Sequence, residues 1–250
     1  MAQPLGALLG RKRTARIGGL VGGAAGYVLA AIAREEGQLV CVTADPKAAD
    51  ALRLDLDAFL PEPSLAFPAW PRGETGGQPD PDVLQARVRV LEALGPEAAD
   101  ADVPVVVVTS IPALLQPVPS PSVIEASALQ LRSREEHVLT MLLEHLALSG
   151  YARVGAVESQ GEFASRGGVL DVWPWGDHSP ARLDFFGDEI ETISLLDPAT
   201  QRSGAALESL RLLALPAERF RHPVPAEDAL LLEHLDESCR VVNVEPDRLG

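Results

Sequence analysis

The chain has 250 residues, 46% of them hydrophobic, and its 36 acidic and 21 basic side chains give a formal net charge of −15. This composition favours one or two folded domains over a disordered tail. It also excludes a general nucleic-acid coat, because a negative surface repels phosphates. Cys41 and Cys239 lack the spacing of a thiolate metal site, which favours a reducing, cytoplasmic setting. The glycine-rich apolar stretch 17–33 is too short to span a membrane, so no membrane association is expected.

Short apolar runs alternate with helical patterns in the first part of the chain. Asp45 and Pro46 supply a helix cap and a first-turn proline, which fixes the start of one helix. Strands separated by helices indicate a parallel sheet with helices on both faces. Residues 16–20 are predicted to be a strand that leads into a glycine loop. The other predicted strands are 38–43, 65–67 and 105–108, and the predicted helices are 24–34, 46–59 and 82–94.

The pattern changes after the proline-rich segment 116–122. Ser133 to Glu136 reads as a capping box that opens a helix, and Gly150 closes it. The short runs that follow leave no room for crossover helices, so they predict an antiparallel sheet joined by hairpins. These strands are 152–157, 161–164, 169–173, 181–186, 190–196 and 209–215. The tail then predicts a helix over 226–235 and a strand over 240–244.

The expected fold class is α/β, with a small antiparallel α+β domain inserted into a parallel-sheet lobe. We expect residues 1–119 to form the first part of the α/β lobe and residues 120–209 to form the inserted domain. Residues 210–250 are expected to return to the α/β lobe.

A glycine-rich loop, 19–26, stands where a phosphate-binding loop would stand, between a predicted strand and a helix. A nucleotide-binding loop needs a lysine and then a hydroxyl residue, but the matching positions are Ala25 and Gly26. The late strand 241–245 has Val244 where an aspartate that holds Mg²⁺ would stand. The loop is therefore interpreted as a degenerate phosphate-binding loop, kept for tight packing, and no cofactor is expected.

Other candidate sites are weaker. His137 and His145 lie on one predicted helix but lack further metal ligands, so no metal site is expected. No spacing typical of catalytic residues occurs, and no catalytic residue is assigned. The carboxylates Asp184, Asp188, Glu189 and Glu191 surround a predicted hairpin turn at 187–188, which favours an exposed turn over an acid/base pair.

The segment 150–203 carries a specific pattern, including the strings GEFASRGGVLDVWP, PARLDFFGDEIE and DPATQRS. It resembles the second domain of the bacterial excision-repair protein UvrB and of the transcription-repair coupling factors. The missing lysine and the strings FPAW, VTSIPALLQ and LPAERF resemble the coupling factors more closely. This resemblance implies that the inserted domain is like UvrB domain 2.

In that family the module recruits UvrA, and the resemblance places the UvrA-contacting positions at Arg166, Arg182 and Phe186. These are residue types that dominate protein interfaces. Because successive side chains of a strand point to opposite faces, we expect one of Phe185 and Phe186 to face outward. The alternative is that Phe186 is core and that the arginines pair locally with Asp171 or Asp184.

The resemblance implies a non-catalytic, UvrA-recruiting part of a longer coupling factor, whose other parts engage RNA polymerase and DNA at a stalled transcription complex. We expect little direct DNA binding by this chain, with the basic segment 11–16 as its one possible contributor. Two alternatives are kept. One is a UvrB-like ATP-dependent repair enzyme, and the other is an autoinhibitory clamp that masks the UvrA-binding face.

Overall fold

The computed structural model describes residues 17, 19–20, 22–71, 80–95, 104–220, 224, 226–235 and 239–244. The basic segment 11–16 and most of the proline-rich loop after Phe67 lie outside these residues. Within 16–20, where the sequence predicts a strand leading into a loop, the described residues 17, 19 and 20 form no strand. The chain divides into two compact units, which are described separately. Unit 1 comprises Met1–Gly73, Val90–Gln116 and Leu230–Gly250, and unit 2 comprises Glu74–Arg89 and Pro117–Ala229.

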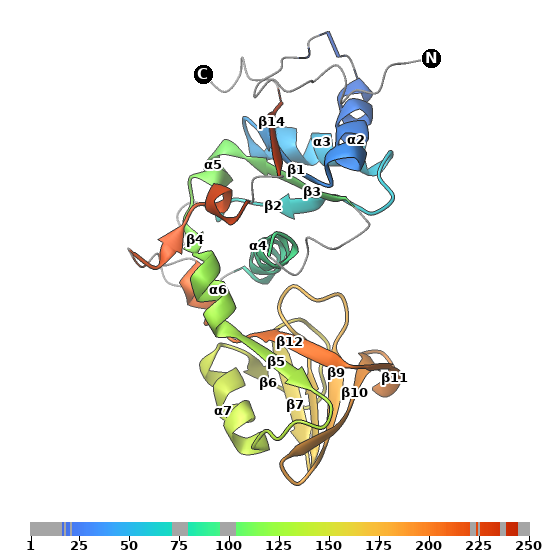
Figure 1. The fold of residues 1–250 in the computed structure, drawn as a ribbon, viewed down its shortest axis with the longest axis vertical. Helices are drawn as coiled ribbons and strands as arrows, with labels where there is room; N and C mark the ends of the chain where they lie inside the picture. Colours follow the sequence, from blue (N-terminus) through green and yellow to red (C-terminus); the bar gives the residue numbers. More distant parts are fainter. Residues whose placement is uncertain are drawn as a thin grey trace. The chain divides into compact units, whose positions relative to one another are not determined.

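Unit 1 contains a four-stranded sheet in which every neighbouring pair is parallel (Figure 1). The strand order is β14-β1-β3-β2, so the last described strand pairs with the first described strand, with Val40 opposite Val241. The strands are β1 (Gln38–Thr43), β2 (Leu65–Phe67), β3 (Val105–Ser110) and β14 (Arg240–Asn243). The predicted parallel sheet is confirmed.

Two helices pack with β1 and β3 around the core of unit 1. The helix α3 begins where the sequence predicts, because the Asp45 carboxylate accepts the Ala48 N–H at 2.9 Å and Pro46 occupies the first turn. The core includes Leu29, Leu39 and Leu56, all 5% exposed or less. The helices assigned wholly or partly to unit 1 are α2 (Ala24–Glu36), α3 (Pro46–Asp57), α4 (Pro81–Ala93), α5 (Ile111–Leu114) and the 3₁₀ turn η3 (Leu231–His234).

Unit 2 contains a six-stranded sheet in the order β11-β10-β9-β8-β7-β6. Its pairs are antiparallel, as predicted, except that β6 and β7 run parallel. The strands are β6 (Ala152–Arg153), β7 (Glu162–Arg166), β8 (Val169–Val172), β9 (Ala181–Phe186), β10 (Glu189–Asp197) and β11 (Arg202–Leu207).

One face of this sheet is covered by the helix α7 (Leu139–Leu148) and by a two-stranded sheet of β5 (Ala128–Arg132) and β12 (Ser209–Leu213). The resulting core includes Leu146, Phe163, Leu170, Leu183 and Ile190, which are at most 1% exposed. The remaining elements of unit 2 are β4 (Val118–Pro119) paired with β13 (Asp228–Ala229), the helix α6 (Pro121–Ser127) and the 3₁₀ turn η2 (Ala217–Phe220).

The predicted capping box at Ser133 to Glu136 is wrong. The helix begins later, at Leu139, with Val138 at its N-cap and no side-chain cap. Residues 133–137 instead pair through their backbone with the tip of the β9–β10 hairpin, which removes them from the helix. The predicted end is confirmed: α7 stops before Gly150, whose φ of +83° suits glycine.

Three other predictions need correction. The strand predicted over 152–157 is only two residues long, because the chain bends at residues 155–156. The helix predicted over 226–235 is replaced by β13 and η3. The strand predicted over 209–215 pairs with β5 outside the six-stranded sheet. Among the described residues, no helix is long and apolar enough to cross a membrane.

Candidate functional site

Arg166, Arg182 and Phe186 lie on one face of the six-stranded sheet. Residues directly opposite each other on neighbouring strands share a face, and successive residues of one strand alternate. Directly opposite residues on neighbouring strands form a row across the sheet. Arg182 is in a row with Asp171, and Arg166 is in the next row on the same face. Phe186 lies two residues beyond Asp184, so it has the same orientation. The row through Arg166 continues across the sheet as Val169, Asp184 and Thr192.

The core lies on the opposite face. Leu170 pairs with Leu183, which pairs with Ile193, and all three are in the core of unit 2. The face that carries the two arginines is therefore free of α7, β5 and β12. Away from the hairpin tip it carries a small apolar cluster of its own, formed by Val157, Ala164 and Leu196.

Arg182 is held by the sheet itself. Its Nε donates to Asp171 Oδ1 at 2.6 Å and its Nη2 donates to Oδ2 at 2.8 Å, a bidentate pair. Its Nη1 also donates to the Gln201 carbonyl at 3.3 Å. The hydrogen bond to the Asp171 carboxylate, together with that group's charge, raises the pKa of Arg182. The expectation that this arginine pairs locally is thus confirmed for Asp171.

Arg166 is the more accessible of the two arginines. Its residue is exposed at the end of β7, and its Nη2 donates to the Gly155 carbonyl at 3.0 Å. The turn that follows uses Gly167 at a φ of +60°, and a Cβ on Gly168 would lie 2.7 Å from the Phe185 carbonyl oxygen. This close approach to β9 requires glycine and fixes the strand end from which Arg166 projects.

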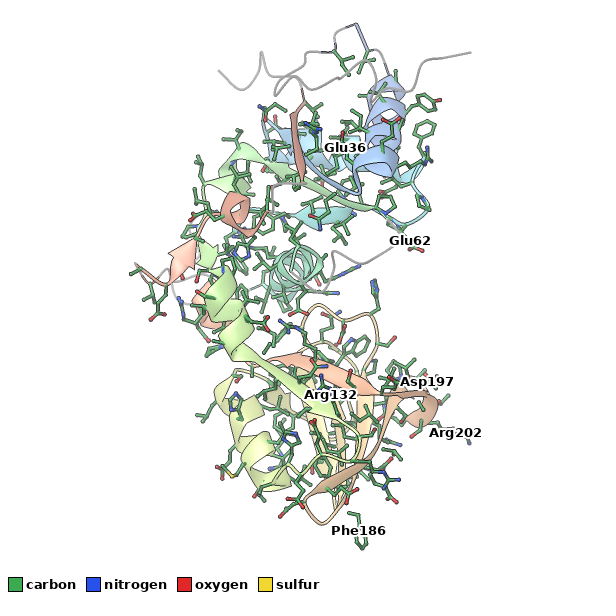
Figure 2. The ribbon with its side chains drawn as sticks, in the orientation of Figure 1. Glu36, Glu62, Arg132, Phe186, Asp197 and Arg202 are labelled. Carbon is green, nitrogen blue, oxygen red and sulfur yellow. The ribbon has the colours of Figure 1, made fainter. Side chains whose placement is uncertain are left out.

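Phe186 is the exposed member of the aromatic pair. It is 80% exposed and projects from the end of β9 (Figure 2), whereas Phe185 is partly buried against the core. The alternation prediction is confirmed, and the alternative that Phe186 is a core residue is wrong. An aromatic side chain this accessible can bury a large area in a partner's pocket.

The exposed hairpin turn predicted at 187–188 is confirmed, and of the four carboxylates Asp188 lies in it, whereas Asp184 lies on β9 and both Glu189 and Glu191 lie on β10. Gly187 takes a φ of +65° between β9 and β10, and Asp188 and Glu189 follow it. Asp184 accepts a hydrogen bond from the Thr192 hydroxyl at 2.8 Å, and Glu189 forms an ion pair with Arg134 at 3.4 Å. Both contacts join the side chains to neighbouring strands or segments.

The C-terminal end of the glycine-rich loop, at Ala25 and Gly26, packs against neighbouring elements. The helix α2 starts at Ala24, and a Cβ on Gly26 would lie 2.7 Å from the backbone of Asp55 on α3. Ala25, at the position of the missing lysine, packs against the core of unit 1. Packing alone therefore accounts for the small residues at these two positions of the loop, and no bound nucleotide is needed to explain them.

The two candidate histidines do not share a helix, which corrects the prediction. His145 lies on α7, but His137 precedes the helix and approaches Glu135, with 3.6 Å between Nε2 and Oε2. Within the described part of the chain, no three His, Cys, Asp or Glu side chains are placed to hold a metal ion.

Sequence reasoning missed the role of residues 133–137. No local signal reveals it, because the segment reads as a helix start and its partners lie on the hairpin tip, far along the chain. Arg134 takes a φ of +73°. Positive φ values are uncommon for residues other than glycine, so the sequence does not predict this conformation at an arginine.

Comparison with known proteins places this face within a described domain. Residues 129–220 match the UvrB interaction domain, which includes Arg166, Arg182 and Phe186. The transcription-repair-coupling factor of Escherichia coli is 30% identical over 209 residues, and that of Myxococcus xanthus is 34% identical over 229 residues. These alignments cover 82% and 87% of the chain. The UvrABC system protein B of Thermosynechococcus vestitus is 36% identical over 114 residues, but that alignment covers only 45% of the chain.

The chain belongs to the UvrB-homology modules of the transcription-repair-coupling factors. Its similarity to the coupling factors runs through both units, whereas the similarity to UvrABC system protein B covers less than half of the chain. The module spans 17% of the Escherichia coli coupling factor and 18% of the Myxococcus xanthus one.

Proposed function

We propose that this module is a non-catalytic, UvrA-binding part of a coupling factor. The observation that supports the proposal is the placement of Arg166, Arg182 and Phe186 on one sheet face, opposite the main core of unit 2, within the UvrB interaction domain. In this proposal the module recruits UvrA, and the remainder of the coupling factor engages RNA polymerase and DNA. A cytoplasmic location and little DNA binding by the module itself belong to the same proposal.

The three residues have different parts in the proposed interface. Phe186 is the apolar anchor, since it is 80% exposed and has no core contact to lose. Arg166 offers an exposed side chain on the same face of the sheet. Arg182 is mostly buried and bonded to Asp171, so it fixes the surface around the anchor as much as it contacts a partner.

The alternative function, that of an ATP-dependent repair enzyme, has less support than the UvrA-binding proposal. Ala25 occupies the position of the phosphate-binding lysine and packs against the core of unit 1, where its methyl group cannot neutralise phosphate charge. We therefore propose that unit 1 is a degenerate phosphate-binding-loop fold with a structural role. The clamp alternative, in which another domain covers the same face, is compatible with the main proposal.

The proposal is tested by titrating the chain with purified UvrA, with and without nucleotide. Phe186→Ala is expected to weaken binding, and Arg166→Ala and Arg182→Ala are expected to abolish it at micromolar concentrations. Interface anchors of this kind contribute on the order of 2 to 4 kcal/mol, which is about 30- to 1000-fold in affinity.

Matched controls separate this face from general surface effects. Leu148 on α7 is 81% exposed, so Leu148→Ala removes a comparable apolar side chain from the helix that packs on the other face. Arg153 on β6 pairs with the core residue Phe163, so Arg153→Ala removes an exposed arginine from the core-facing side. Both controls, and Ala25→Lys in unit 1, should bind UvrA like the parent. If Phe186→Ala and Arg166→Ala bind normally while Ala25→Lys does not, the site is misplaced.

A further inference from the structure

The tip that carries Phe186 is bonded to a separate segment of the chain. Residues 133–137, here named the strap, run antiparallel to the start of β10 before the chain enters α7. The Arg134 N–H donates to the Ile190 carbonyl at 2.7 Å, and the Ile190 N–H donates to the Glu135 carbonyl at 2.9 Å. The His137 N–H donates to the Asp188 carbonyl at 2.6 Å. Three backbone hydrogen bonds therefore join the strap to the tip.

The strap occupies an edge that the sheet leaves open. The strand β11 pairs with β10 only from Ile193 onward, so the outer edge of residues 188–190 has no partner from β11. On the other side, the last backbone hydrogen bond from β9 toward β8 is the one that the Phe185 N–H donates to the Gly168 carbonyl at 2.7 Å. Without the strap, the hairpin beyond Phe185 would therefore consist of two strands only, an arrangement that is marginally stable by itself. Glu189 lies directly opposite Phe186 across this hairpin, and Ile190 is fully buried beside them. The strap thus braces the same few residues that present Phe186.

We propose that the strap is a positioning element of the UvrA-binding face: it holds the hairpin tip in the conformation in which Phe186 is presented to the partner. This inference rests on the proposed function. Affinity falls in proportion to the fraction of molecules in the binding-competent conformation. A tip that is competent about one tenth of the time binds about tenfold more weakly, with every contact residue still present.

The side chains of the strap contribute little to its attachment to the hairpin tip. Glu136 lies opposite Glu189, and these like charges oppose the pairing. Arg134 offsets this repulsion through its 3.4 Å ion pair with Glu189, but both side chains are well exposed, so that contribution is small. The backbone hydrogen bonds therefore dominate the attachment.

The first test removes one of these bonds. His137→Pro deletes the N–H that donates to Asp188, whereas His137→Ala removes the imidazole and keeps that N–H. In titrations with purified UvrA, His137→Pro is expected to bind about tenfold more weakly and His137→Ala to bind like the parent. Equal binding by His137→Pro and the parent would overturn the proposal.

The second test asks whether the effect passes through Phe186. In a Phe186→Ala background, His137→Pro is expected to cause no further loss, because the residue that it positions is absent. The same loss in both backgrounds would show a merely structural role and overturn the inference. Normal binding by Phe186→Ala alone would refute the proposed interface instead, so the two failures are distinguishable.

A cross-link keeps the inference testable if His137→Pro does not fold. The hydrogen-bond pattern makes Glu136 and Glu189 a non-hydrogen-bonded pair, in which Cα atoms lie about 4.5 Å apart, within disulfide range. In a Glu136→Cys/Glu189→Cys variant, the reduced form lacks the Arg134 ion pair and the oxidised form fixes the strap. Oxidation is expected to increase UvrA affinity about threefold. No change on oxidation, or weaker binding, would contradict the positioning role.

Discussion

Replacing Arg182 with alanine is expected to destabilise unit 2 in the absence of any partner. The arginine and Asp171 side chains are 21% and 12% exposed, and two short hydrogen bonds join them. Breaking a fully buried ion pair from one side costs about 3 to 5 kcal/mol, and an exposed pair contributes at most about 1 kcal/mol. For this intermediate burial we expect Arg182→Ala to lower the free energy of unfolding by about 2 to 3 kcal/mol, because the Asp171 carboxylate is left without its main partner.

The assay is urea unfolding followed by tryptophan fluorescence, since Trp173 and Trp175 both belong to unit 2. The Asp171→Ala/Arg182→Ala double variant removes the stranded charge, so its loss should be smaller than the sum of the two single losses. An Arg182→Ala protein that unfolds at the same urea concentration as the parent would refute this reasoning. In that case, any loss of UvrA binding by this variant would come from a lost contact between Arg182 and UvrA, and not from a destabilised unit 2.

Three further predictions follow from unit 1 and from the loop after β8. Gly26→Ala is expected to destabilise unit 1 by about 1 to 3 kcal/mol in thermal unfolding, because its Cβ would lie 2.7 Å from the Asp55 backbone. Gly23→Ala, whose Cβ would meet nothing closer than 4.0 Å, should cost clearly less. Burial raises the pKa of Asp177 from 3.8 to about 6, so the folded chain binds this proton more tightly and loses stability as pH rises through that range. Asp177→Asn should therefore raise the urea midpoint at pH 7 more than at pH 4, and an equal gain at both would contradict this. The chain should bind no ATP·Mg²⁺ in equilibrium dialysis, since Ala25 stands at the lysine position, and a micromolar site would disprove it.

Elements with strong local signals were predictable from the sequence. The strand predicted over 181–186 matches β9, because alternating apolar residues end at the Gly187 turn. The start of α3 was predictable because Asp45 caps it directly. Strand alternation also showed that one of Phe185 and Phe186 faces outward, and the structure identifies which.

Features that depend on distant pairing were not predictable. Ser133 has the type and spacing of a helix cap, but its N–H donates to the Glu208 carbonyl and its neighbours bond to the hairpin tip. Non-local backbone hydrogen bonds therefore override a local capping signal. The candidate face itself needed the strand register, because only the register shows that Arg166 and Arg182 project from one side of the sheet.

The pairing of β14 with β1 has a consequence for the order of folding during synthesis. The sheet of unit 1 is complete only when Val241 and its neighbours have left the ribosome, whereas every strand of the six-stranded sheet precedes them in the chain. A polypeptide emerging from its N-terminus can therefore finish the later unit first. Once folded, that unit shortens the flexible connection between β3 and β14, which lowers the entropy cost of closing the parallel sheet. Variants that slow the folding of unit 2 should consequently delay unit 1 as well.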